Sequence, residues 1–113
     1  PLANPSADTC RHCDYRSVCD PYWESLRLDW RRSAPRPSSD IRGDISGQEE
    51  TIGGTSLTVD VQSPSDWPSP TCRVAPVIEE IPRNASRVSI VDAVTAGAES
   101  LKISWDTIVR FAD

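Results

Sequence analysis

Histidine, lysine and methionine are almost missing from this sequence of 113 residues. It holds one histidine, His12, one lysine, Lys102, and no methionine, against eleven arginines. Because Ser–His and Cys–His catalysis needs an imidazole as the general base, any such system would have to be built around His12. No glycine-rich loop of the P-loop or dinucleotide-binding type occurs either. The sequence therefore contains no recognisable catalytic set of its own.

Long apolar runs and aromatic residues are also scarce. No apolar stretch approaches the roughly 20 residues of a membrane-spanning helix, and no secretory signal is visible. The apolar fraction of 37% and the aromatic fraction of 6% indicate a modest core. The length fits a single small domain. We expect the C-terminal part of a cytoplasmic protein that has no contact with a membrane.

Cysteines, in contrast, are concentrated near the start of the chain. Cys10, Cys13 and Cys19 lie within ten residues at C-x2-C-x5-C spacing. Without a secretory signal, this spacing indicates a metal site more often than a disulfide. Thiolates suit zinc or an iron–sulfur cluster, and both need a fourth ligand. His12 and Cys72 are the candidates within the chain, and three reduced structural thiols are the metal-free alternative.

The residues around these cysteines narrow the choice of metal. Cys10, Cys13 and Cys19, followed by Pro21-Tyr22-Trp23, resemble the C-terminal cluster segment of RecB-like PD-(D/E)XK nucleases. The resemblance covers roughly the first quarter of the chain. It implies that the three cysteines bind a [4Fe–4S] cluster, with the fourth cysteine far upstream of this chain. In that family the cluster pins the ends of the nuclease domain together. Zinc is the alternative metal.

The catalytic residues of such nucleases have no counterpart in this chain. The family's Asp, Glu-x-Lys and Gln-x3-Tyr motifs precede the cluster segment, and none of them is present here. The resemblance therefore implies a C-terminal accessory part of a RecB-family DNA exonuclease, whose chemistry lies upstream. Its implied partner, through the full-length protein, is DNA in single-stranded form.

A short helix and a linker are expected after the cysteines. Asp20 suits the N-cap and Pro21 the first helical position. Four residues recur at helical spacing and form one apolar stripe: Tyr22, Trp23, Leu26 and Trp30. The prolines and serines that follow cannot continue a helix. We therefore divide the chain into a cysteine-rich metal-binding segment with its helix (1–32), a linker (33–39) and a β domain (40–113).

From Asp40 onward the apolar residues recur with a period of two, which indicates β strands. The expected strands cover residues 41–50, 55–63, 71–81, 87–95 and 101–111, the last with a kink near Asp106. A hairpin is expected at Gly53-Gly54, and Gly43 would allow a sharp bend in the first strand. The prediction is a mainly β fold, a small five-stranded barrel similar to an OB-fold. An SH3-like barrel or a small sandwich is the alternative.

The same alternation assigns side chains to the core. Cys72, Val74 and Ile78 are expected on the core side of the third strand. Pro76 in that strand marks an edge or a bulge position. Trp105 is in phase with the apolar residues of the last strand and is expected in the core.

OB-folds often bind single-stranded nucleic acid through basic residues and exposed aromatic side chains. The candidate contacts here are Trp67, in a proline- and serine-rich loop, and three strand residues: Arg42, Arg73 and Arg87. Capping the barrel is the alternative role of Trp67. From residue 40 onward, six basic residues against twelve acidic ones give a net charge of −6, which opposes binding to phosphates. The alternative function is a zinc loop plus β-barrel module that binds a protein partner through its acidic surface, with no nucleic-acid role.

Overall fold

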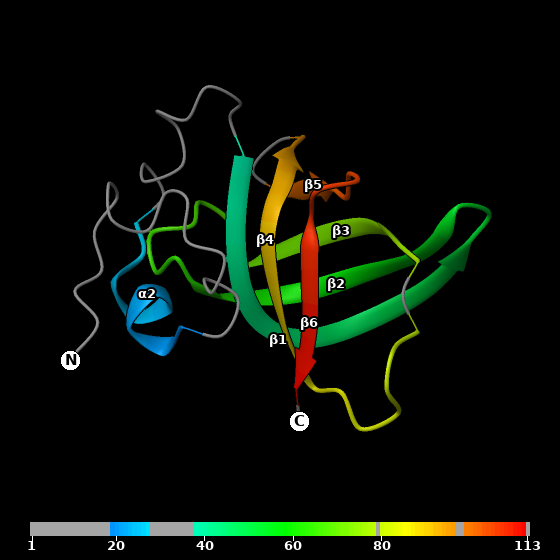
Figure 1. Ribbon diagram of the computed structural model, residues 1–113, viewed down its shortest axis with the longest axis horizontal. Coiled ribbons are helices and arrows are strands. Elements are labelled where there is room, and N and C mark those ends of the chain that lie inside the picture. The colour runs from blue at the N-terminus through cyan, green and yellow to red at the C-terminus, as the bar shows by residue number, and fades with distance from the viewer. Residues whose placement is uncertain (1–18, 28–37, 79, 97–98, 113) are drawn as a thin grey trace.

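The computed structural model describes residues 19–27, 38–78, 80–96 and 99–112. In these ranges one short helix, α2 (Asp20–Ser25), precedes six strands (Figure 1). The strands are β1 (Ser38–Thr51), β2 (Gly54–Ser63), β3 (Thr71–Val77), β4 (Arg87–Thr95), β5 (Ser100–Lys102) and β6 (Ile108–Ala112). The mainly β prediction is confirmed. No helix in the described ranges is long and apolar enough to cross a membrane.

The six strands form one mixed sheet in the order β1-β2-β3-β5-β4-β6. An additional pairing between β1 and β4 joins the two sides, so that β1, β2, β3, β5 and β4 make a ring. All pairings are antiparallel except that of β3 with β5. β6 pairs with β4 alongside this ring. Hereafter "the ring" means these five strands.

β1 takes part in two pairings because it bends. Its first half pairs with β4 and its second half with β2, and Figure 1 shows the strand curving between them. A register shift in the β1–β2 pairing falls between Arg42 and Gly43. A Cβ atom on Gly43 would lie 2.0 Å from the carbonyl oxygen of Asp60. Glycine is therefore required where the backbones of β1 and β2 approach each other, at the residue that was expected to permit the bend.

The last predicted strand is divided into two. β5 ends at Lys102 and β6 begins at Ile108, so five strands were expected where the structure has six. A turn separates the two strands: the Thr107 N–H donates to the Ser104 carbonyl at 3.1 Å, and the Ser104 N–H donates to the Thr107 hydroxyl at 3.0 Å. Trp105 lies in this turn and is 87% exposed, so its assignment to the core was wrong. The Thr107 side chain thus accepts a hydrogen bond from a backbone N–H group that would pair with a neighbouring strand if the strand were continuous. The alternation of inward and outward side chains therefore ends at this turn.

A bulge in β3 explains a second wrong assignment. Leu57 pairs with Val74 and Thr55 pairs with Val77, so an advance of two residues along β2 corresponds to an advance of three residues along β3. Pro76 lies in the extra length, which confirms its expected bulge position. The shift turns Val77 into the core and leaves Ile78 beyond the strand and 76% exposed. Cys72 and Val74 are buried in the core as predicted.

Two apolar clusters hold the described chain together. The main cluster consists of inward-facing residues of the ring: Ile41, Leu57, Val59, Cys72, Val74, Val77, Val88, Ile90, Ala93 and Leu101. Asp92 has a φ of 61°, and an extra residue in β4 at this point reverses the alternation of inward and outward side chains. Val91 consequently joins a second cluster with Tyr22, Trp23 and Leu26. This second cluster attaches α2 to the ring.

Candidate functional site

Cys19 is the one predicted metal ligand within the described residues; Cys10 and Cys13 lie outside them. Cys19 has an extended backbone and is the N-cap of α2, and its carbonyl accepts the Trp23 N–H at 3.3 Å. Asp20 therefore begins the helix instead of capping it, contrary to expectation. The Cys19 thiol is free, half-buried, and packs against the second apolar cluster. Among the described residues, no three Cys, His, Asp or Glu side chains come together as a metal site.

Cys72, the other cysteine in the described ranges, has a different environment. It is 1% exposed and belongs to the main cluster inside the ring, whereas Cys19 packs against the cluster outside it. Burial raises the pKa of the Cys72 thiol to about 12. Metal ions bind thiolates, so a thiol that stays protonated is a poor ligand. The environment of Cys72 fits a structural residue and not the fourth ligand of a metal site.

Helix α2 is fixed to the ring by buried polar contacts as well as by apolar packing. The Tyr22 hydroxyl donates to the carboxylate of Asp40, which is 2% exposed. The same carboxylate accepts the backbone N–H of Asp92 at 2.8 Å. The Ser63 hydroxyl donates to the carbonyl of Trp23 at 2.5 Å. Residues of β1, β2 and β4 thus hold the helix, and the position of Cys19 relative to the ring is set by these contacts.

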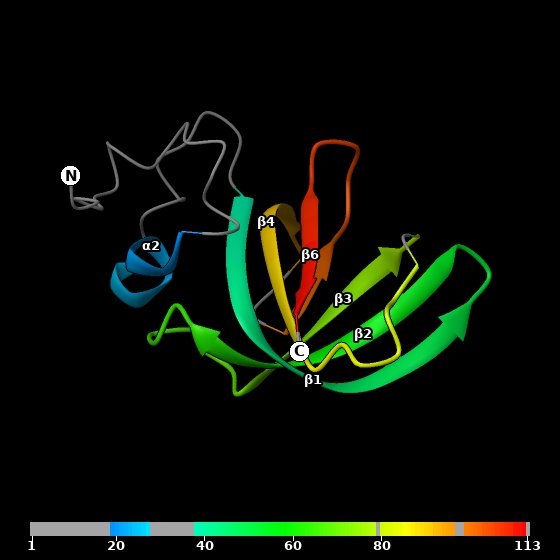
Figure 2. The same cartoon turned by 60° about the horizontal axis from the view of Figure 1, so that its bottom comes forward.

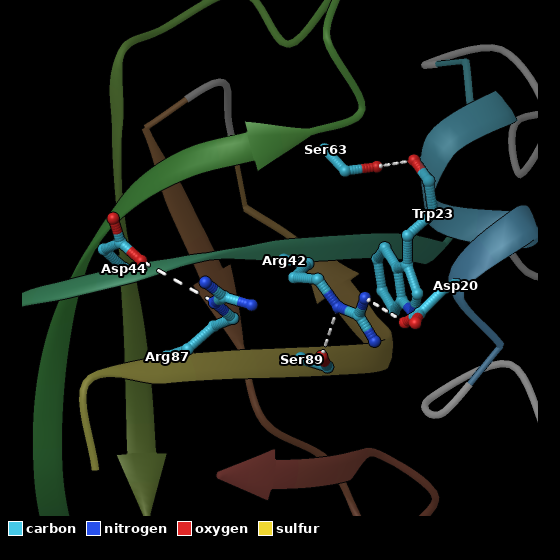
Figure 3. Close-up of polar contacts among 7 residues, drawn as sticks. All are labelled: Asp20, Trp23, Arg42, Asp44, Ser63, Arg87 and Ser89. Carbon is cyan, nitrogen blue, oxygen red and sulfur yellow. Dashed lines mark hydrogen bonds and ion pairs between the residues drawn. The ribbon is translucent and has the colours of Figure 1, made fainter. Parts of the chain in front are cut away.

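Arg42 connects α2 to the outer face of β1 and β4 (Figure 3). Its Nε donates to the Ser89 hydroxyl at 2.8 Å, and a terminal guanidinium nitrogen lies 2.9 Å from a carboxylate oxygen of Asp20. The guanidinium carbon is 5.0 Å from the ring centroid of Trp23, a distance at which cation and aromatic face attract. The side chain is only 18% exposed. Arg42 is therefore engaged on three sides by protein groups.

Arg87 lies on the same outer face and also has a carboxylate neighbour. Its Nε is 3.9 Å from the Asp44 carboxylate, which directly opposes it in the β1–β4 register (Figure 3). Asp44 also accepts the side-chain amide of Gln62 at 2.9 Å. Both members of the ion pair are 51% exposed, so the attraction is weakened by solvent. The positive charge on this face is nevertheless matched locally by negative charge.

A surface pocket of about 570 Å³ lies against this region. Arg42, Ser89 and Arg110 line it from β1, β4 and β6, and the carboxylates of Asp20 and Glu80 line it as well. Two guanidinium groups are thus accompanied by two carboxylates. The pocket therefore gives a polyanion no net positive charge to bind.

The remaining predicted residues, Arg73 and Trp67, lie elsewhere. Arg73 is exposed on β3, where it pairs with Thr58 of β2, and β2 separates it from β1 in the ring. Trp67 is half-buried and packs against the main cluster, and its indole N–H is buried without a hydrogen-bond partner among the described residues. The structure brings Arg42 and Arg87 together on one face. It does not bring Arg73 or Trp67 to that face.

Two exposed residues, Lys102 and Trp105, were not among the predicted nucleic-acid contacts. Lys102 ends β5 with its side chain exposed, next to buried Leu101. Trp105 follows in the turn between β5 and β6. A signal was present: Ser104, Asp106 and Thr107 are residues whose short polar side chains stabilise turns by bonding to nearby backbone. These three residues indicate a turn around Trp105, and they are a stronger signal than the alternation of apolar residues that predicted a strand there.

Comparisons with known proteins identify no relative: no family model, no curated protein and no solved structure matches this chain.

Proposed function

We propose that this chain is the C-terminal accessory part of a RecB-family DNA exonuclease. In this proposal Cys10, Cys13 and Cys19 are three ligands of a [4Fe–4S] cluster, and the fourth ligand lies upstream. The ring is an OB-like barrel that guides single-stranded DNA, and the chemistry of strand cleavage resides in the preceding nuclease domain. Zinc is the alternative occupant of the cysteine segment.

The observation that carries the proposal is the attachment of Cys19 to the ring. Cys19 caps a helix whose Tyr22 and Trp23 are 1% and 4% exposed against the strands. A cluster bound at Cys19 would therefore be held at a fixed position relative to the ring. This arrangement suits an accessory domain that must keep one orientation towards a nuclease body joined through the same cluster.

The order of the strands supports the OB-like part of the proposal. An OB-fold is a five-stranded, partly open Greek-key barrel. The ring closes in the order β1-β2-β3-β5-β4-β1, and its pairing of β3 with β5 spans only three residue pairs. A short pairing at this point is what a partly open barrel requires. β5 and β6 both pair with β4. Together they take the place of the single fifth strand of an OB-fold.

The cluster assignment is tested by anaerobic reconstitution of the chain, extended upstream to include the missing ligand, with iron and sulfide. We expect a brown protein with the visible absorption of a thiolate-bound cluster. Cys19→Ala should lose this absorption, whereas Cys72→Ala should keep it because that thiol is enclosed in the ring. A colourless protein that binds stoichiometric zinc under the same conditions would refute the iron–sulfur assignment and favour the zinc alternative.

A second function is favoured by one observation, the matched charges around Arg42 and Arg87. Both guanidinium groups have carboxylate neighbours, Asp20 and Asp44, and the sequence from residue 40 onward is acidic. A module that binds a protein partner, with no nucleic-acid role, would suit such a surface better than a DNA-binding groove. Binding to single-stranded DNA distinguishes the two functions.

A further inference from the structure

The turn between β5 and β6, residues 103–107, presents a tryptophan to solvent. Trp105 is 87% exposed, whereas Trp23 is 4% exposed. Figure 2 shows this turn at the top of the view, projecting beyond the strands that it joins. A large aromatic side chain in water loses the favourable free energy of burial. An exposed tryptophan at a projecting turn is therefore a candidate for contact with a ligand.

The turn is held in one conformation before any ligand binds. The Ser104 hydroxyl donates to the Asp106 carboxylate at 2.5 Å, and the Ser104 N–H donates to the Thr107 hydroxyl at 3.0 Å. The Thr107 hydroxyl donates in turn to the carbonyl of Asp92 at 3.0 Å. Asp92 is the bulged residue of β4, so the turn is anchored to the ring. Trp105 is thus presented by an ordered backbone, which lowers the entropy that binding would cost.

Two cations that have no acidic partner among the described residues lie on β3 and β5, the strands that lead to this turn. Arg73 pairs with Ser100 and Ala75 pairs with Lys102 in the parallel register of β3 and β5. Arg73 and Lys102 are both exposed and alternate with buried residues, so they share the outer face of these two strands. No ion pair joins either side chain to a carboxylate in the described ranges. Arg42 and Arg87, by contrast, each have such a partner.

We propose that Arg73, Lys102 and Trp105 form a binding surface for single-stranded nucleic acid. Trp105 stacks on an unpaired base, and the two cations contact phosphates of the nucleotides that continue from this base along the outer face of β3 and β5. This inference rests on the proposed role of the ring in guiding single-stranded DNA and names the residues that perform it. Duplex DNA is a poor ligand, because its bases are already stacked on one another and cannot reach Trp105.

The surrounding carboxylates limit how tightly this surface can bind. Glu99 precedes β5, and Asp106 lies in the turn itself. Asp106 accepts a hydrogen bond from Ser104, but its charge remains close to the proposed site. Only two cations contact phosphate, so the logarithm of the association constant should fall with the logarithm of salt concentration with a slope of about −1.4. The binding should therefore be weak and detectable chiefly at low ionic strength.

The experiment measures fluorescence anisotropy of a labelled oligothymidylate of about 12 nucleotides, within the range of site sizes known for OB domains. The 113-residue chain is titrated at low salt and again at rising salt concentrations. Trp105→Ala should weaken binding roughly 5- to 100-fold, and Trp105→Phe should retain much of it because a phenyl ring still stacks. Arg73→Gln and Lys102→Gln should each reduce the salt slope by about 0.7.

The matched control is Arg83→Gln, which removes an exposed arginine in the loop before β4. This variant should bind like the unmodified chain, and thermal unfolding should show all variants equally folded. Absence of binding at low salt, or binding that Trp105→Ala leaves unchanged, would overturn the inference. Equal affinity for a duplex of the same length would also overturn it. None of these results would affect the cluster assignment, which depends on the cysteines and is read from the colour of the reconstituted protein.

Discussion

Two outer faces of the ring carry the same types of residue and use them differently. On the face formed by β1 and β4, Trp23 is buried and the guanidinium of Arg42 is bonded to Asp20 and Ser89. On the face formed by β3 and β5, Arg73 and Lys102 are exposed to solvent, and so is Trp105 in the turn that follows β5. Residue type therefore does not decide whether an arginine or a tryptophan is structural or available. The neighbouring elements decide it, because α2 covers one face and, among the described residues, no element covers the other.

Because of this difference, substitutions on one face should change the stability of the fold, and substitutions on the other should change ligand binding. Substitutions on the covered face remove buried contacts and should lower the free energy of unfolding. Substitutions on the exposed face should leave stability unchanged and affect only ligand binding. The difference can thus be tested by pairs of equivalent substitutions, one of an enclosed residue and one of an exposed residue, in order of decreasing effect.

The largest difference is expected between the two tryptophans. Trp23→Ala should lower the free energy of unfolding by about 3 kcal/mol, because it removes a buried indole from the contact between α2 and the ring. Trp105→Ala should change it by less than about 0.5 kcal/mol. Urea denaturation followed by circular dichroism measures both values. A Trp23→Ala protein as stable as the Trp105→Ala protein would mean that α2 is not attached to the ring in solution.

Two aspartates of β1 give the next comparison. Asp40→Asn should cost about 2 kcal/mol, because the amide that replaces the carboxylate cannot accept both the Tyr22 hydroxyl and the Asp92 N–H equally well. Asp44→Asn should cost less than about 0.5 kcal/mol, since its ion pair with Arg87 is half exposed. Denaturant titration of both variants at neutral pH measures the difference. Equal losses would show that Asp40 is no more important than a surface carboxylate.

Much of the fold could be predicted from alternation and turn chemistry. The hairpin between β1 and β2, the special role of Gly43 and the bulge at Pro76 all follow from local signals that the backbone itself obeys. Ile78 and Trp105 were placed wrongly for a common reason. A bulge or a turn shifts the period by one residue or ends it, and alternation alone does not show where this happens.

The candidate site was less predictable because it depends on pairs of residues far apart in sequence. The sequence showed that Arg42, Arg73 and Arg87 lie on strands. It could not show that Asp20 reaches Arg42 from the helix, or that Asp44 opposes Arg87, because both contacts depend on the register and on the position of α2. The metal assignment stays a prediction, since Cys10 and Cys13 lie outside the described residues.

On the inner side of β3, Cys72 makes the stability of the fold depend on pH. Burial raises the pKa of Cys72 to about 12, from 9.0 for an unperturbed thiol. The folded state therefore resists ionisation of this thiol, and stability is constant with respect to it below pH 9. As pH rises from 9 towards 12, the unfolded state loses the proton first and stability falls, by roughly 1 kcal/mol at pH 10.

The control for this pH dependence is Cys72→Ala, which keeps every other titrating group. Its free energy of unfolding should be lower at neutral pH because a buried side chain is shortened, but it should fall less steeply between pH 9 and pH 10. Urea denaturation at both pH values gives the two slopes. Parallel profiles for the variant and the unmodified chain would show that the Cys72 thiol is accessible to water in the folded state.

The smallest expected difference concerns the arginines, and it isolates the effect of the neighbouring elements most directly. Arg42→Met should cost about 1 kcal/mol, because it removes the bond to Ser89 and the contact with the Trp23 ring while keeping an apolar stem of similar length. The ion pair with Asp20 adds little, since that carboxylate is 76% exposed. Arg73→Met should be neutral within about 0.5 kcal/mol. If Arg73→Met proved as destabilising as Arg42→Met, the outer face of β3 would have to carry a structural contact, and Arg73 would no longer be available to bind a phosphate.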